Sequence, residues 1–182
     1  MSDHGTRIAP TRPSDSAPHR ATQLEFAQFY SQHMAKLVRH LMRQGASIHE
    51  ATEASQAAFT EAFVKWETIE HPAAWLRQVS LRLYWRRHSH REEPVQEIPE
   101  LPGGPCPLQQ VELKEQEARV CAALASLPPL QRQVLAWHLD EFSTTEISVA
   151  LGMTPEAVRQ NLSRGRARLK TILLSSTDGG GR

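Results

Sequence analysis

A chain of 182 residues with 40% apolar residues, 23% charged residues and a formal net charge of +1 has the composition of a soluble protein with one ordinary domain or two small ones. No apolar run is long enough to span a membrane and the N-terminal residues lack the hydrophobic segment of a secretory signal, so we expect a cytoplasmic protein without membrane insertion. Two cysteines without a CxxC spacing and scattered histidines do not match metal-site patterns, so we expect neither a metal nor another cofactor.

The small net charge hides a strong segregation along the chain. Residues 48–70 hold five glutamates against one lysine, and residues 92–117 hold seven glutamates against one lysine. Residues 72–91 carry five arginines and no acidic residue, and residues 157–170 carry four arginines and one lysine, again without an acid. These blocks predict two surfaces that bind polyanions and separate acidic surfaces that face something else.

The first half of the chain predicts a tail followed by a domain of three helices over residues 22–91. Residues 1–21 contain little that could be buried, and we expect them to be disordered. Ser47 and Glu50 form a capping box that starts the second helix, and Pro72 suits the first turn of the third. The apolar face of the third helix is predicted to consist of Trp75, Leu76, Val79 and Leu83.

The second half predicts an extended linker and a second helical domain. Residues 92–107 are rich in Pro, Gly and Glu and cannot form a core, whereas residues 108–174 return to helical periodicity and residues 175–182 form a flexible tail. We therefore expect an all-α protein in which two small helical domains are joined by a Pro-rich linker.

Residues 143–173 match a helix-turn-helix. Ser143 and Glu146 form a capping box, Gly152 lies in the turn, and Thr154 precedes a longer helix with a basic outer face. The N-terminal part of such a helix reads base edges in the major groove, and later basic residues hold phosphates. Glu156, Arg159, Gln160 and Ser163 are therefore the predicted base contacts, and Arg164, Arg166, Arg168 and Lys170 the predicted backbone contacts. The alternative is a solvated amphipathic helix in a helical hairpin.

The helix over residues 72–91 allows two interpretations. Arginines interleaved with exposed aromatic rings suit single-stranded or melting DNA, because arginine holds phosphate while a ring stacks on an unpaired base. A helix that packs one apolar face in a core and exposes a charged outer face to solvent would give the same pattern. The ring of Trp75 falls on the apolar face and is predicted to be buried, whereas Tyr84 and Trp85 fit either interpretation.

Over residues 24–174 the chain resembles an extracytoplasmic-function sigma factor of the sigma-70 family. The L-P-x-x-Q-R-x-V-L start, the E-I-x-x-x-L-G core and the V-x-x-x-L-x-R-x-R-x-x-L helix within residues 127–170 are similar to the family's region four. A-T-E-A-S-Q-x-x-F at residues 51–59 and H-P-x-A-W-L at residues 71–76 are similar to its region two.

The resemblance implies a subunit that directs core RNA polymerase to promoters and helps to open them. Residues 155–173 would read the minus-thirty-five element, and Arg77, Arg82, Tyr84, Trp85, Arg86 and Arg87 would contact the minus-ten element. Glu53 and Gln56 would bind the clamp of the largest polymerase subunit, and region four would dock on the flap. Proteins of this family are often held inactive by an anti-sigma factor, which is therefore a candidate partner.

Three departures from the family pattern concern single positions. Arg82 and Arg86 stand where the family usually has Asn and Asp, which bears on base preference at the minus-ten element. Gly165 stands where Ala is frequent, a change expected to cost about 1 kcal/mol of helix stability.

The alternative function is a helix-turn-helix regulator that binds DNA without being a polymerase subunit. We expect no catalytic activity, because the sequence offers no nucleophile, paired-carboxylate or metal arrangement.

Overall fold

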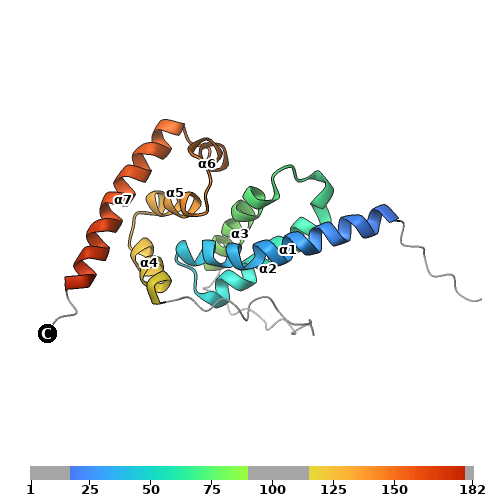
Figure 1. Cartoon of the computed structure of the whole chain (residues 1–182), viewed down its shortest axis with the longest axis horizontal. Coiled ribbons are helices and arrows are strands. Elements are labelled where there is room, and N and C mark those ends of the chain that lie inside the picture. Colours follow the sequence, from blue (N-terminus) through green and yellow to red (C-terminus); the bar gives the residue numbers. More distant parts are fainter. Residues whose placement is uncertain (1–16, 90–114, 179–182) are drawn as a thin grey trace, which may run out of the picture.

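The structure, a computed structural model, describes residues 17–89 and 115–178. Within these ranges it contains helices and no strand, which confirms the all-α fold class. The predicted linker, residues 92–107, and the first residues of the predicted second domain lie outside the described residues. The helices are α1 (Ala17–Arg43), α2 (Ile48–Lys65), the short 3₁₀ helix η1 (Trp66–Thr68), α3 (Pro72–Ser89), α4 (Glu115–Ala125), α5 (Pro129–Leu139), α6 (Thr144–Leu151) and α7 (Pro155–Asp178) (Figure 1).

The outer ends of the first and last helices differ from the predicted boundaries. Helix α1 begins at Ala17, inside the segment 1–21 that was predicted to be a tail, and α7 continues to Asp178, past residue 174. Apolar periodicity marks only the part of a helix that packs, whereas backbone hydrogen bonding can continue beyond it.

The local start and stop signals act as predicted. Ser47 Oγ accepts a hydrogen bond from the Glu50 amide at 3.3 Å, and Glu50 Oε2 accepts one from the Ser47 amide at 2.9 Å. Ser143 and Glu146 repeat this capping box at the start of α6, with distances of 3.2 and 2.8 Å. Gly152 ends α6 with a φ of 63°, a left-handed conformation that glycine adopts without strain.

Helices α1, α2 and α3 form the first unit around a shared core. Helix α2 contributes mainly alanines at helical spacing, which allows α1 and α3 to approach it closely, and Phe59 fills the space near its C-terminal end. Trp75 packs at the edge of this core and is only partly buried, in contrast to its predicted burial. The fully or nearly fully buried side chains include Met34, Leu37, Val38, Leu41, Leu76, Val79 and Leu83.

Helices α4 to α7 form the second unit, with α5 lying under the helix-turn-helix of α6 and α7. Val158 and Leu162 of α7 pack on Val134, Leu135 and Trp137 of α5 and on Ile147 of α6. Gly165 is also buried, and a Cβ atom at this position would lie only 2.7 Å from Leu135 Cδ1. The glycine therefore permits a close approach of α7 to α5.

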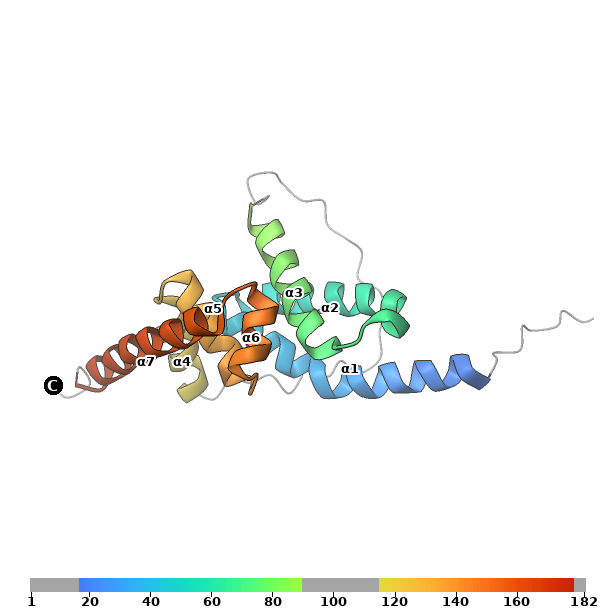
Figure 2. The same cartoon turned by 90° about the horizontal axis from the view of Figure 1, so that it is seen from above.

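The two units contact each other directly, through a seam that the sequence did not predict. Helices α4 and α5 pack against α1, and Ala74 of α3 touches the second core. The basic helices α3 and α7 nevertheless belong to different cores, and Figure 2 shows α7 extending away from the first unit. None of the described helices is long and apolar enough to cross a membrane.

Candidate nucleic-acid interface

Helix α7 presents one polar, mainly basic face to solvent. Its opposite face is held in the second core by Val158 and Leu162, and the turn at Gly152 fixes its angle to α6. Arg159 donates a hydrogen bond from Nη2 to Glu156 Oε1 at 2.7 Å, so these two predicted base contacts are paired with each other in the absence of DNA. All eight predicted contacts on this helix are exposed: Glu156, Arg159, Gln160, Ser163, Arg164, Arg166, Arg168 and Lys170.

One of these arginines is positioned from outside its own helix. Arg166 Nη2 lies 2.5 Å from Nε2 of His138, which is located in the last turn of α5. Because a guanidinium can only donate, the imidazole nitrogen must be its acceptor. His138 thus restrains a side chain of the proposed phosphate-contacting set, a role that the sequence did not indicate.

The six predicted minus-ten residues all lie on α3, and they fall into an exposed group and a buried group. Arg82, Trp85, Arg86 and Arg87 are exposed on its C-terminal half. Arg77 and Tyr84 are each only 5% exposed, so neither is available to DNA in this structure, contrary to the sequence prediction. The two residues are buried by different neighbours. Tyr84 lies in the core that α3 forms with α1 and α2, whereas Arg77 is covered where α3 meets the second unit and bonds to Asp140. Trp85 remains as the accessible ring, 39% exposed and 5.2 Å from the ring of Tyr84.

The charge that balances α3 lies directly across from it on α2. Arg87 Nη1 contacts Glu53 Oε2 at 2.5 Å, and Arg82 Nη2 contacts Glu61 Oε2 at 3.7 Å. These pairs are solvent-exposed and contribute little to stability, but they orient the arginines. The acidic face of α2 therefore meets the basic face of α3 instead of forming a fully separate surface. Gln56, the other predicted polymerase contact, is exposed on the same helix.

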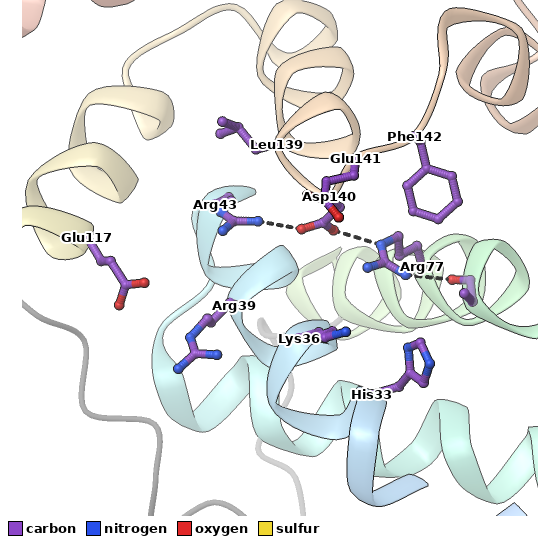
Figure 3. Close-up of a pocket in the computed structure, with 11 residues that line it drawn as sticks. His33, Lys36, Arg39, Arg43, Arg77, Glu117, Leu139, Asp140, Glu141 and Phe142 are labelled. Carbon is purple, nitrogen blue, oxygen red and sulfur yellow. Dashed lines mark hydrogen bonds and ion pairs between the residues drawn. The ribbon is translucent and has the colours of Figure 1, made fainter. Parts of the chain in front are cut away.

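The most strongly bonded charge cluster lies in the seam, centred on Asp140 at the end of α5. Its Oδ2 accepts hydrogen bonds from Arg77 Nε and from His40 Nδ1, each at 2.7 Å, and its Oδ1 accepts one from Arg43 Nη1. Figure 3 shows Arg43 of α1 and Arg77 of α3 reaching this carboxylate from two sides. The Arg77 guanidinium also lies 4.8 Å from the ring centroid of Phe142.

Burial and pairing set the protonation states in this cluster. Burial alone would raise the pKa of Asp140, but the hydrogen bonds and charges of His40 and Arg77 outweigh it and lower that pKa to about 2. The pKa of His40 is lowered, chiefly because the ring is fully buried and also because of the charges of Arg77 and Arg43, against the opposing effect of Asp140. A neutral His40 thus donates to an ionised Asp140 at neutral pH.

Comparisons with known proteins place the chain in a family. The family model described as "Sigma-70, region 4" matches residues 118–169. A protein named RNA polymerase sigma-E factor, from Streptomyces coelicolor, is 30% identical over 159 residues, which cover 84% of this chain and 88% of that protein. The ECF RNA polymerase sigma factor SigE of Mycolicibacterium smegmatis is 26% identical over 87% of this chain and 65% of its own length.

The chain belongs to the extracytoplasmic-function sigma factors. Its fold agrees with this membership, because the solved sigma factor RpoE from Bartonella quintana, crystallised with the anti-sigma factor NepR, superposes with a TM-score of 0.63. That match covers 82% of this sigma factor and 96% of RpoE at 17% sequence identity. In this sigma factor α6 and the part of α7 up to residue 169 lie within the part of the chain that matches region four.

Proposed function

We propose that this sigma factor directs core RNA polymerase to its promoters in the cytoplasm by reading the minus-thirty-five element with α7 and engaging the minus-ten element with the exposed end of α3. The observation that carries the proposal is the face of α7, on which eight polar or basic side chains are exposed opposite a buried apolar face. A helix held in this way by a capped helix-turn-helix fits the major groove with its basic residues at the phosphates.

The minus-ten contact is proposed for Arg82, Trp85, Arg86 and Arg87. Trp85 is the exposed ring among them and is suited to stack on an unpaired base. Arg82 and Arg87 are held by glutamates of α2, whereas no ion pair of Arg86 is found among the described residues. Arg86 is thus the arginine whose guanidinium can meet a phosphate without first leaving a carboxylate.

The proposed polymerase contact on α2 consists of Glu53 and Gln56. Both face solvent at least in part, and Glu53 also holds Arg87 of α3. Binding of Glu53 to a basic group of the polymerase would compete with Arg87, so the polymerase contact and the minus-ten contact are adjacent and share a charge. Core polymerase and promoter DNA are the proposed partners, and an anti-sigma factor stays a prediction from the family.

The function is tested by transcription with purified core polymerase. The full chain should comigrate with core on a sizing column and support transcription from a promoter that core alone does not use. Tight, dimeric binding to a palindrome without core, and no transcription with it, would instead identify a helix-turn-helix regulator.

The minus-ten assignment is tested in the same assay with Arg86→Ala. Promoter opening, measured by permanganate reactivity of unpaired thymines, should fall more than closed-complex binding. The matched control is Arg119→Ala, an exposed arginine on α4 outside both proposed DNA surfaces. Permanganate reactivity equal to that of the control would remove Arg86 from the minus-ten contact.

A further inference from the structure

One side chain of α5 reaches the exposed basic face of α7. Nε2 of His138, in the last turn of α5, lies 2.5 Å from Nη2 of Arg166. Because a guanidinium has only donors, Nε2 carries no proton in this contact, and His138 is the neutral tautomer with its proton on Nδ1. Among the described residues, no other predicted DNA contact of α7 has a hydrogen bond to a different helix.

The reach of His138 depends on the close approach of α5 to α7. Gly165, which precedes Arg166, lies so near Leu135 that a Cβ atom on the glycine would be 2.7 Å from Leu135 Cδ1. Leu135 and His138 are three positions apart and therefore lie on the same face of α5. The contact that seats α7 on the second core thus also brings the imidazole to the guanidinium.

A neutral partner affects an arginine differently from an acidic one. Arg159 is paired at 2.7 Å with the carboxylate of Glu156, which offsets its charge and has to be displaced before a phosphate can take its place. The neutral imidazole of His138 orients Arg166 without offsetting its charge. Arg166 is exposed, and its bond to His138 leaves the other donors of the guanidinium available to the oxygens of a phosphate.

We propose that His138 is a positioning residue for the upstream promoter element, which holds Arg166 in the conformation that meets a DNA phosphate and so makes this arginine the pre-oriented backbone contact of α7. The inference rests on the proposed function, because it assumes that α7 binds DNA. It adds α5 to the elements that determine the affinity for the promoter. His138 acts through Arg166 and reads no base.

The size of the effect follows from the side-chain freedom that is lost when DNA binds. Completely ordering a free arginine lowers an affinity by roughly thirtyfold, and a side chain that is already held in the free protein loses less. One hydrogen bond restricts part of this freedom, so removal of the imidazole acceptor should weaken DNA binding by about three- to tenfold. A phosphate contact carries no sequence information, so the loss should be equal on different sequences.

The test uses holoenzyme assembled from core polymerase and the full chain. The probes are a duplex promoter that the wild type transcribes and the same duplex with one base pair of its upstream element changed. His138→Phe keeps a ring and removes the acceptor, and it should weaken binding to both probes by about three- to tenfold. His138→Gln places an amide oxygen near the position of Nε2 and should bind within about twofold of the wild type.

Two backgrounds separate an effect through Arg166 from a general effect. With Arg166→Ala, His138→Phe should cause no further loss, because the group that it positions is absent. Arg168→Ala removes another exposed arginine of α7, for which no hydrogen bond or ion pair is found among the described residues, and there His138→Phe should keep its full effect. A residue that only stabilises the fold would have the same effect in both backgrounds.

The proposal is overturned if His138→Phe binds both probes like the wild type, if it has the same effect in the two backgrounds, or if His138→Gln binds as weakly as His138→Phe. If circular dichroism shows that His138→Phe has lost helix, His138→Leu takes its place in every comparison. A holoenzyme that transcribes and responds to Arg159→Ala but not to the His138 variants refutes this inference alone. A holoenzyme whose promoter binding responds to no variant of α7 refutes the proposed function as well.

Discussion

Replacing Gly165 by alanine sets two effects of known size against each other. Alanine in a helix interior is about 1 kcal/mol more favourable than glycine, so the helix alone predicts a gain in stability. The new Cβ, however, would lie 2.7 Å from Cδ1 and 3.2 Å from Cγ of Leu135, whose side chain is packed in the second core. Carbon atoms in contact prefer about 3.5–4.0 Å, so Leu135 or α7 must move by nearly 1 Å.

Overpacking of this kind costs about 1–3 kcal/mol, which equals or exceeds the helix gain. We therefore expect Gly165→Ala to leave the free energy of unfolding unchanged or lower it by up to about 2 kcal/mol. Urea unfolding followed by circular dichroism measures this difference in the full chain. The reasoning is refuted if Gly165→Ala raises the unfolding free energy by the full helix gain of about 1 kcal/mol.

Two controls separate the helix effect from the packing effect. Ala167→Gly changes an exposed residue of the same helix and should cost about 1 kcal/mol, which calibrates the helix effect locally. In a Leu135→Ala background the obstructing atoms are absent, so Gly165→Ala should become stabilising there. A substitution with the same effect in both backgrounds would show that Leu135 does not restrict the site.

Three other predictions concern the seam and the two binding surfaces. Because burial lowers the pKa of His40 in the folded protein, the free energy of unfolding should fall by up to about 1.4 kcal/mol per pH unit as the pH falls below 6.5. Urea unfolding at pH 7.5 and 5.5 measures this fall, which His40→Gln should reduce. Arg159→Ala should cost about 1–3 kcal/mol at one or two upstream base pairs, whereas a uniform loss across sequences would make it a phosphate contact. Gln56→Ala should weaken binding to core polymerase and leave DNA binding unchanged. Glu53→Ala should also release Arg87 from its carboxylate partner and so change binding to the minus-ten element. Titrations with core polymerase, and with a DNA probe whose minus-ten element is already unpaired, measure the two effects.

The parts of the fold that depend on short stretches of chain were predictable. Both capping boxes, the turn at Gly152 and the N-cap at Thr154 require only residues within three or four positions of each other, and each forms the expected hydrogen bonds or backbone conformation. The same holds for the apolar faces of α3 and α7, because helical periodicity places Leu76, Val79, Val158 and Leu162 inward without knowledge of their partners.

Predictions failed where a side chain depends on something distant in the sequence. Gly165 was assessed from helix propensity alone, although its environment is set by Leu135, thirty residues earlier on another helix. The residue pattern left Tyr84 open between a ring that stacks on DNA and a ring beside the core, and only the resemblance to the family implied a minus-ten contact. The burial of Tyr84 follows from the packing of α3 against the rest of the first unit, which a single-helix pattern does not reveal.

Arg77 and Arg82 show why charge alone does not identify a DNA contact. They lie five positions apart in the same basic block, yet one is buried against Asp140 and the other is two-thirds exposed beside Glu61. The two arginines differ in how close a carboxylate lies to them and in how exposed they are to water. The carboxylate that pairs with Arg77 belongs to Asp140, which is 63 residues away in the chain. Because a buried guanidinium must be paired, Arg77 links the two units, whereas Arg82, whose pair is weak and solvated, can exchange its carboxylate for a phosphate at little cost.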